Sequence, residues 1–166
     1  YPSTLRGEDP NVVDLLRKIA VDDYFDAIEV NWIKNDRLRS EAAKLLDASH
    51  LTVCYGAQPR LLTTGLNAND VNEEMRAKAE ATLIEAIDEA EQLGAKGIAF
   101  LSGKWDAATK DLAYEQLLKT TRNLCAYAKT KGMMVELEVF DFDIAKKSLI
   151  GPAPYAAKFA ADVRST

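Results

Sequence analysis

The chain has 166 residues, of which 48% are hydrophobic and 28% are charged, a balance typical of a globular domain with a sizeable core. Its net charge of −5 predicts no nucleic-acid partner, because such a partner needs clustered positive charge. No apolar run approaches the roughly 18 residues of a membrane-spanning helix, so no membrane partner is predicted. Cys54 and Cys125 lie far apart in the sequence, which predicts reduced thiols in a cytoplasmic protein.

Short apolar runs alternate with longer amphipathic segments from the start of the chain. Asp9 and Pro10 are typical of a helix start, and apolar residues at helical spacing follow them. A strand is predicted at 25–30, then a helix that Asn35 or Asp36 caps, then a second strand at 50–55. The segment 56–69, which contains a proline and a glycine, is predicted to be a loop.

The second half of the chain repeats this alternation. The predicted elements are a long helix that starts at Asn69 or Asp70 and stops at Gly94, a strand at 97–101, a loop at 102–109, a helix at about 111–130, a strand at 133–139, a loop at 141–154 and a last helix from Tyr155.

Strands separated by helices predict an α/β fold with a parallel sheet and right-handed crossovers. An open doubly wound sheet and a (β/α)₈ barrel both fit this order, and both alternatives stay open. No predicted strand is followed by the glycine-rich motif of a dinucleotide-binding or P-loop protein, which disfavours those two classes.

The carboxyl ends of the predicted strands carry polar, aromatic and acidic side chains. In parallel α/β proteins this end of the sheet holds the chemistry, so these residues are the candidate site. The collection suits a hydroxyl-rich ligand, and its candidate substrate contacts are Glu29, Cys54, Gln58, Ser102, Trp105 and Asp141. Three of these residues have a structural alternative: an ion pair for Glu29, core packing for Cys54, and covering of the core for Trp105.

Two glutamates in the last predicted strand give the sharpest signal. Glu136 and Glu138 are two residues apart, so both side chains point to the same face of the sheet. The apolar residues between and beside them suit the helix layer, which leaves the glutamates facing inward. Inward carboxylates are costly unless they pair with Lys or Arg or bind a cation such as Mg²⁺ or Mn²⁺. Both alternatives stay open.

Several of these segments resemble one known family. The runs 25–30, 93–98 and 135–141, and the strand that ends in Ser102 and Gly103, are similar to parts of the xylose isomerase-like barrel family, which includes sugar phosphate isomerases/epimerases. The resemblance implies a (β/α)₈ TIM barrel, of which this chain supplies about strands 2–5. Since such barrels need about 250 residues, we expect 1–166 to be a single domain that forms part of a longer TIM-barrel domain.

The resemblance also implies a function and a cofactor. The expected activity is a divalent-metal-dependent sugar or sugar phosphate isomerase or epimerase, which removes a proton alpha to a carbonyl. Glu138 matches the family's strand-five glutamate, which is both catalytic and a metal ligand. The expected metal is Mn²⁺ or Mg²⁺, with Co²⁺ or Zn²⁺ as alternatives, and the expected partners are a small sugar or polyol and further copies of the chain in a homo-oligomer.

Three other functions are weighed on the same barrel. A lyase or C-glycoside-cleaving subunit would use the same proton abstraction. A non-catalytic barrel with a decayed site would pair Glu136 and Glu138 with basic residues. The DNA-repair endonuclease branch of the superfamily is disfavoured, because the chain has one histidine and a net charge of −5.

Overall fold

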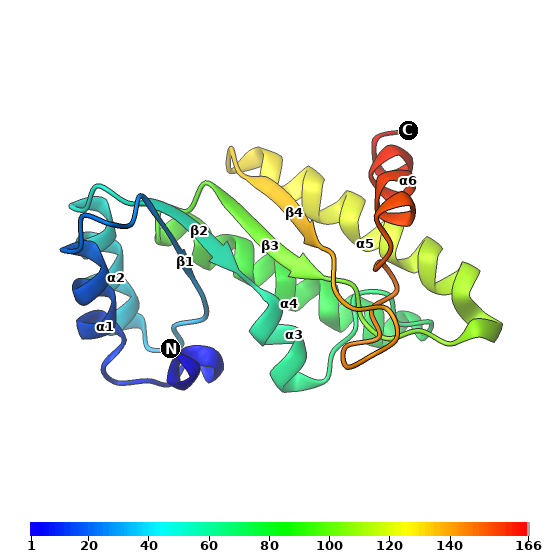
Figure 1. The fold of residues 1–166 in the computed structure, drawn as a ribbon, viewed down its shortest axis with the longest axis horizontal. Coiled ribbons are helices and arrows are strands. Elements are labelled where there is room, and N and C mark those ends of the chain that lie inside the picture. The colour runs from blue at the N-terminus through cyan, green and yellow to red at the C-terminus, as the bar shows by residue number, and fades with distance from the viewer. Residues whose placement is uncertain (166) are drawn as a thin grey trace.

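Four parallel strands form one sheet in the computed structural model, which describes residues 1–165 (Figure 1). The strands are β1 (Ala27–Val30), β2 (Thr52–Gly56), β3 (Gly97–Leu101) and β4 (Met134–Glu138). Their spatial order is β1-β2-β3-β4, the same as their order in the chain. A doubly wound sheet reverses direction at a switch point, whereas successive neighbours are the arrangement of a barrel wall. The sheet therefore has the order of a partial barrel.

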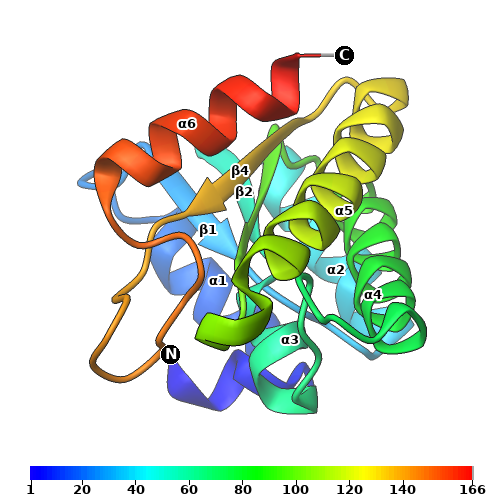
Figure 2. The same ribbon diagram turned by 90° about the vertical axis from the view of Figure 1, so that its right-hand side faces the viewer.

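Helices connect the strands and cover one side of the sheet. They are α1 (Val12–Ala20), α2 (Asp36–Asp47), α3 (Gln58–Thr64), α4 (Glu73–Gln92), α5 (Lys110–Thr130) and α6 (Ala153–Arg164), with two 3₁₀ turns, η1 (Pro2–Arg6) and η2 (Ala107–Thr109). Figure 2 shows α4 and α5 side by side, and α1 and α2 also contact each other. None of the helices in the described residues is both long and apolar enough to cross a membrane.

The predicted loop at 56–69 is wrong, because α3 occupies half of it. Pro59 lies in the first turn of α3, where its missing N–H costs nothing. Gly65 ends the helix with a φ of 72°, the left-handed conformation that glycine adopts easily. The two residues interpreted as loop formers are thus the start and stop signals of a short helix.

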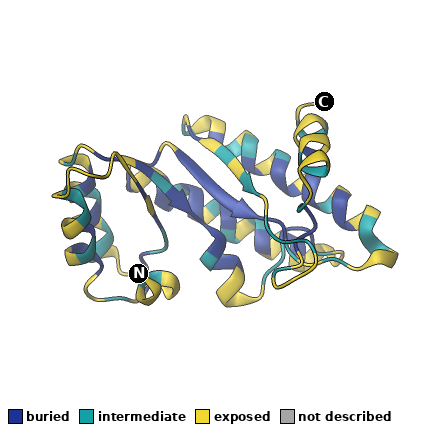
Figure 3. Ribbon diagram, viewed as in Figure 1, coloured by how far each residue is buried: buried dark blue, intermediate teal, exposed yellow. Residues whose placement is uncertain are grey.

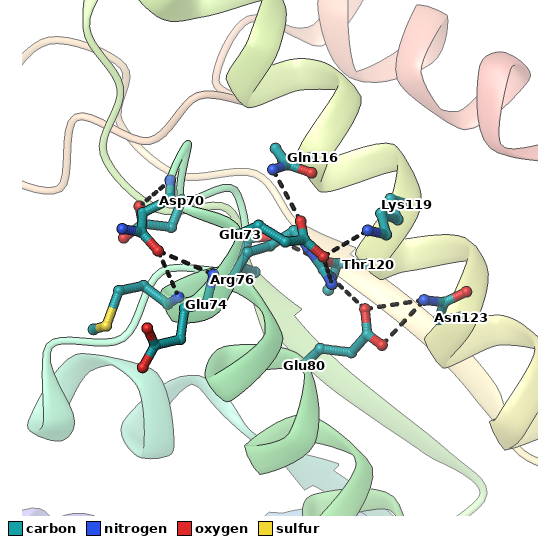
Figure 4. Close-up of polar contacts among 12 residues, drawn as sticks. Asp70, Glu73, Glu74, Arg76, Glu80, Gln116, Lys119, Thr120 and Asn123 are labelled. Carbon is teal, nitrogen blue, oxygen red and sulfur yellow. Dashed lines mark hydrogen bonds and ion pairs between the residues drawn. The ribbon is translucent and has the colours of Figure 1, made fainter.

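The predicted start of the long helix is also wrong, by about three residues. Asn72, not Asn69 or Asp70, caps α4: its Oδ1 accepts hydrogen bonds from the backbone N–H of Glu74 at 2.9 Å and of Met75 at 3.2 Å. Asp70 instead accepts from the backbone N–H of Asn72 at 2.9 Å (Figure 4). The last helix begins at Ala153, two residues before the predicted Tyr155. The prediction that Asn35 or Asp36 caps α2 is confirmed, with Asn35 in that role.

The two faces of the sheet differ in polarity. Ile28, Val53, Ile98 and Phe100 belong to the buried core, together with apolar residues of α4 and α5. The opposite face follows from the register, which pairs Glu29 with Cys54, Gly56 with Ala99, and Ala99 with Glu136. Figure 3 shows β3 buried throughout, whereas β1 and β4 are only partly buried. The polar face is the one that would line the interior of a barrel.

Candidate functional site

Carboxylates gather on the polar face of the sheet. Glu136 and Glu138 share one face of β4, while Val135 and Leu137 pack against the core on the other. This orientation is the one predicted from the sequence. Within residues 1–165, the ion pairs that the structure forms involve neither these two glutamates nor Glu29.

The charges on this face influence one another. Burial raises the pKa of Glu29, and the negative charges of Glu138 and Glu136 raise it further. Burial also raises the pKa of the Cys54 thiol, with further contributions from Glu136 and Glu29. The face therefore has a negative potential that extends from β1 to β4 and favours a cation or a group that donates hydrogen bonds.

Gly56 lets two polar side chains meet at the end of β2. A Cβ atom at this position would lie 2.5 Å from Oε1 of Glu29 and 2.7 Å from Oε1 of Gln58. Any larger residue would push one or both of them away. Gln58 is buried in the first turn of α3, and Cys54 lies beside Glu29 in the strand register. The structure thus brings together Glu29, Cys54 and Gln58, three of the sequence-predicted substrate contacts.

The other three predicted substrate contacts hold the loops that follow β3 and β4. Ser102 is fully buried, and its Oγ accepts a hydrogen bond from the backbone N–H of Ile150 at 2.9 Å. The carboxylate of Asp141 accepts from the backbone N–H groups of residues 144–147, which hold its pKa below the usual value. The ring of Trp105 lies 4.9 Å from that of Phe142. Substrate contact by all six residues stays a prediction.

Two asparagines that the sequence analysis did not select fix the loop after β3. Asn69 is 1% exposed; its Oδ1 accepts from the backbone N–H of Gly103 at 2.6 Å, and its Nδ2 donates to the carbonyl oxygen of Lys104 at 2.9 Å. Asn67 donates to the same carbonyl at 2.9 Å. A Cβ atom at Gly103 would lie 2.1 Å from Oδ1 of Asn67, so any other residue there would displace the Asn67 amide. The sequence signal for this role is the pair Asn67 and Asn69, two residues apart and shortly after Gly65, which ends α3.

An ionic cluster around the buried Arg76 supports these asparagines from the helix layer (Figure 4). Arg76 of α4, 3% exposed, binds Glu73 at 2.9 Å and also contacts Glu80 and the Oγ1 of Thr120 on α5. Thr120 Oγ1 in turn donates to the carbonyl oxygen of Ala68 at 3.0 Å, between the two asparagines. The cluster therefore connects the α4–α5 interface to the loop at the carboxyl end of the sheet.

A second buried cluster joins α3, α4 and β2. Nη2 of Arg60 lies 2.6 Å from Oε2 of Glu89, and the hydroxyl of Tyr55 donates to Oε1 of Glu89 at 3.1 Å. Burial and the charge of Glu89 raise the pKa of Tyr55 well above its usual range. The backbone N–H of Ile33 also donates to Glu89, at 2.7 Å. This cluster fixes the segment after β1 and the position of α3.

The described residues supply few metal-ligating side chains that lie close to one another. Among residues 1–165, no three His, Cys, Asp or Glu side chains lie close enough together to hold a metal ion. The described residues therefore do not form a metal site by themselves. An ion bound through Glu138 needs further ligands from outside this set.

Comparison with known proteins identifies the fold. A family model described as xylose isomerase-like TIM barrel matches residues 18–148. The chain belongs to this family. Its predicted fold class, an α/β partial barrel of the xylose isomerase-like type, is therefore confirmed. No curated protein matches the sequence.

Solved structures agree with the family assignment. A D-psicose 3-epimerase with D-tagatose from Clostridium cellulolyticum H10 superposes with a TM-score of 0.76 at 18% identity, covering 94% of this chain and 55% of that one. A D-tagatose 3-epimerase-like protein gives 0.70 at 17%, covering 89% and 54%. A xylose isomerase domain protein from Planctomyces limnophilus gives 0.63 at 21%, covering 92% and 54%. At these identities the likeness is one of fold, and the chain spans about half the length of these proteins.

Proposed function

We propose that the chain is part of a divalent-metal-dependent isomerase or epimerase that acts on a sugar or sugar phosphate. The observation that carries the proposal is the position of Glu138. It lies at the carboxyl end of β4, on the polar face, with Glu136 on the same strand and no ion pair among the described residues. A half-buried carboxylate without a basic partner is suited to bind a cation and to accept a proton.

The proposed chemistry begins with removal of a proton alpha to the substrate carbonyl. Glu138 accepts this proton as a general base, and its return to the neighbouring carbon gives the isomer. Epimerisation requires a second acid, from outside the described residues, that protonates the same carbon from the opposite face. A divalent metal ion, Mn²⁺ or Mg²⁺ with Co²⁺ or Zn²⁺ as alternatives, would stabilise the developing oxyanion when bound. In this proposal Glu138 supplies one ligand, and the remaining ligands come from outside the described residues.

Substrate orientation is assigned to the polar groups around Gly56. Glu29, Cys54 and Gln58 lie together at the ends of β1 and β2, where the amide and carboxyl groups can bind sugar hydroxyls. Ser102, Trp105 and Asp141 are assigned the border of the substrate site, since their contacts hold the loops after β3 and β4. The ligand in this proposal is a small sugar or polyol.

The proposal also includes the cellular location and the oligomeric state of the protein. Cys54 and Cys125 are both free thiols, which supports a cytoplasmic location. Assembly into a homo-oligomer stays a prediction, which light scattering of the purified full-length protein tests directly.

The decisive experiment replaces Glu138 in the full-length protein. Glu138→Gln is expected to reduce bound metal and to lower kcat on its sugar substrate by about 10²–10⁴-fold, the usual contribution of a general base. Glu115→Gln, on the exposed side of α5, is the matched control and is expected to change neither. Unchanged metal content and turnover in Glu138→Gln would refute the assignment.

A further inference from the structure

A cavity of about 420 Å³ lies at the carboxyl end of β3. One wall is apolar and is formed by leucines of α3 and the turn after it. The other wall comes from the loops after β3 and β4, and its polar members are Ser102, Lys104, Lys146 and Ser148, while Asn67 lines the cavity from the segment after α3. The two loops are held together by an antiparallel β-bridge between Lys104 and Ser148. The polar wall is therefore built from two segments more than 40 residues apart in the sequence that have a fixed relative position.

Ser148 carries an unsatisfied polar atom in this wall. The residue is fully buried, and its Oγ has no hydrogen-bond partner within residues 1–165. Its neighbour on the same loop, Leu149, is also fully buried, but its backbone N–H is paired with the carbonyl oxygen of Gly103 at 3.0 Å. Buried hydroxyl groups are normally hydrogen-bonded, so an orphaned one at a cavity wall indicates a ligand that supplies the missing partner.

The charge in the cavity is positive. Lys104 and Lys146 take part in none of the ion pairs found within residues 1–165. No Asp or Glu lines the cavity, and the nearby carboxylate of Asp141 is bound by the backbone N–H groups of residues 144–147. Two ammonium groups, a hydroxyl and an amide are all able to donate hydrogen bonds, which is the donor set of an oxyanion site.

We propose that this cavity binds the phosphate group of a phosphorylated sugar. Lys104 and Lys146 balance the charge of the phosphate, and the hydroxyl of Ser148 donates a hydrogen bond to one of its oxygens. The inference rests on the function proposed above and narrows its substrate class from sugars in general to sugar phosphates. Leu101 lines the cavity and pairs with Glu138 in the β3–β4 register, so the cavity and Glu138 lie at the same end of the sheet.

Titration with inorganic phosphate tests the binding site without reference to catalysis. In the full-length protein, isothermal titration calorimetry is expected to detect phosphate, with an affinity that falls as the salt concentration rises. Lys104→Met and Lys146→Met should each weaken Kd about tenfold, and Ser148→Ala about fivefold, because each removes one charged or charge-assisted contact. Since Ser148→Ala removes an unsatisfied hydroxyl, its thermal unfolding should match that of the parent protein.

Lys147→Met is the matched control, since Lys147 is the exposed neighbour of Lys146 and does not line the cavity. Its Kd for phosphate should stay within twofold of the parent value. No detectable phosphate binding, or equal weakening in Lys147→Met and Lys146→Met, would overturn the inference.

Kinetics separates a substrate phosphate from a free phosphate ion. The ratio of kcat/KM for a ketose phosphate to kcat/KM for the free ketose should exceed one in the parent protein and fall about tenfold in Lys104→Met. A ratio of one or less, with active enzyme, would overturn the inference but leave the proposed function standing. Phosphate binding without turnover of either sugar class would contradict the proposed function instead. The cavity would then bind an anion that is not part of a substrate.

Discussion

Glu89 offers the sharpest test of how the fold is held together near the site. Its side chain is 7% exposed and that of Arg60 is 4% exposed, so their 2.6 Å ion pair is almost fully removed from water. Glu89→Gln keeps the shape of the side chain but removes its charge and one acceptor oxygen. The buried guanidinium of Arg60 then keeps only the distant, exposed carboxylate of Glu85 as a counter-charge, and loss of a buried partner typically costs about 3–5 kcal/mol in free energy of unfolding.

The measurement is urea unfolding of the full-length protein followed by circular dichroism. With slopes of about 1–3 kcal/mol/M, the loss should lower the midpoint by about 1–5 M. Glu85→Gln is the internal control, because Glu85 is 75% exposed and its oxygen lies 3.9 Å from the same arginine. This exposed pair should contribute no more than about 1 kcal/mol.

A double variant distinguishes a lost charge partner from a general packing defect. Arg60→Met combined with Glu89→Gln removes both charges but keeps the side-chain oxygen that accepts from Ile33 and Tyr55, and should recover most of the stability lost in Glu89→Gln alone. A loss below about 1 kcal/mol in Glu89→Gln, or a loss equal to that of Glu85→Gln, would refute the reasoning.

Three further predictions concern the loops and the end of β2. Asn69→Ala removes the hydrogen bonds to the N–H of Gly103 and to the carbonyl of Lys104. The variant should lose about 2–4 kcal/mol in free energy of unfolding, and hydrogen exchange at the Gly103 amide should become faster. Unchanged exchange at that amide would contradict the role given to Asn69. Gly56→Ala should displace Glu29 and Gln58, because its Cβ atom would lie 2.5 Å from the Glu29 carboxylate. The KM for the substrate should therefore rise severalfold, while the melting temperature changes little. An unchanged KM would argue against substrate contact by these residues. The pKa of Asp141 is lowered in the folded chain by the backbone N–H groups of residues 144–147, so its stabilising effect is complete above the unfolded pKa and is lost as pH falls through the lower folded pKa. Asp141→Asn should therefore be less stable than the parent at pH 7 and equal to it in strong acid, as measured by tryptophan fluorescence during unfolding. An equal difference in stability at both pH values would contradict this.

The sequence predicted the sheet because its signals there are local. Each strand is a short apolar run between helices, and the alternation of Glu136 and Glu138 with Val135 and Leu137 sets the face of β4 by geometry alone. The boundaries of β3, at 97–101, agree with the structure to the residue. The alternation of helices and strands fits both a barrel and a doubly wound sheet, and only the family resemblance distinguished the two.

The contacts that order the site were not predictable, because they join residues far apart in the sequence. Asn69 meets Gly103 across 34 positions, Ser102 meets Ile150 across 48, and Thr120 meets Ala68 across 52. No periodic pattern records such pairs, since each depends on how the loops lie after the sheet forms. Helix α3 was missed for a different reason, since seven residues are too few for helical periodicity to separate them from a loop that contains Pro59.

Anomalous diffraction from crystals of the full-length protein grown with Mn²⁺ tests the central claim most directly. The account predicts an anomalous peak within coordination distance, about 2.0–2.6 Å, of a carboxylate oxygen of Glu138, and the loss of that peak in Glu138→Gln. A manganese peak elsewhere, or saturating Mn²⁺ with no peak beside Glu138, would contradict it.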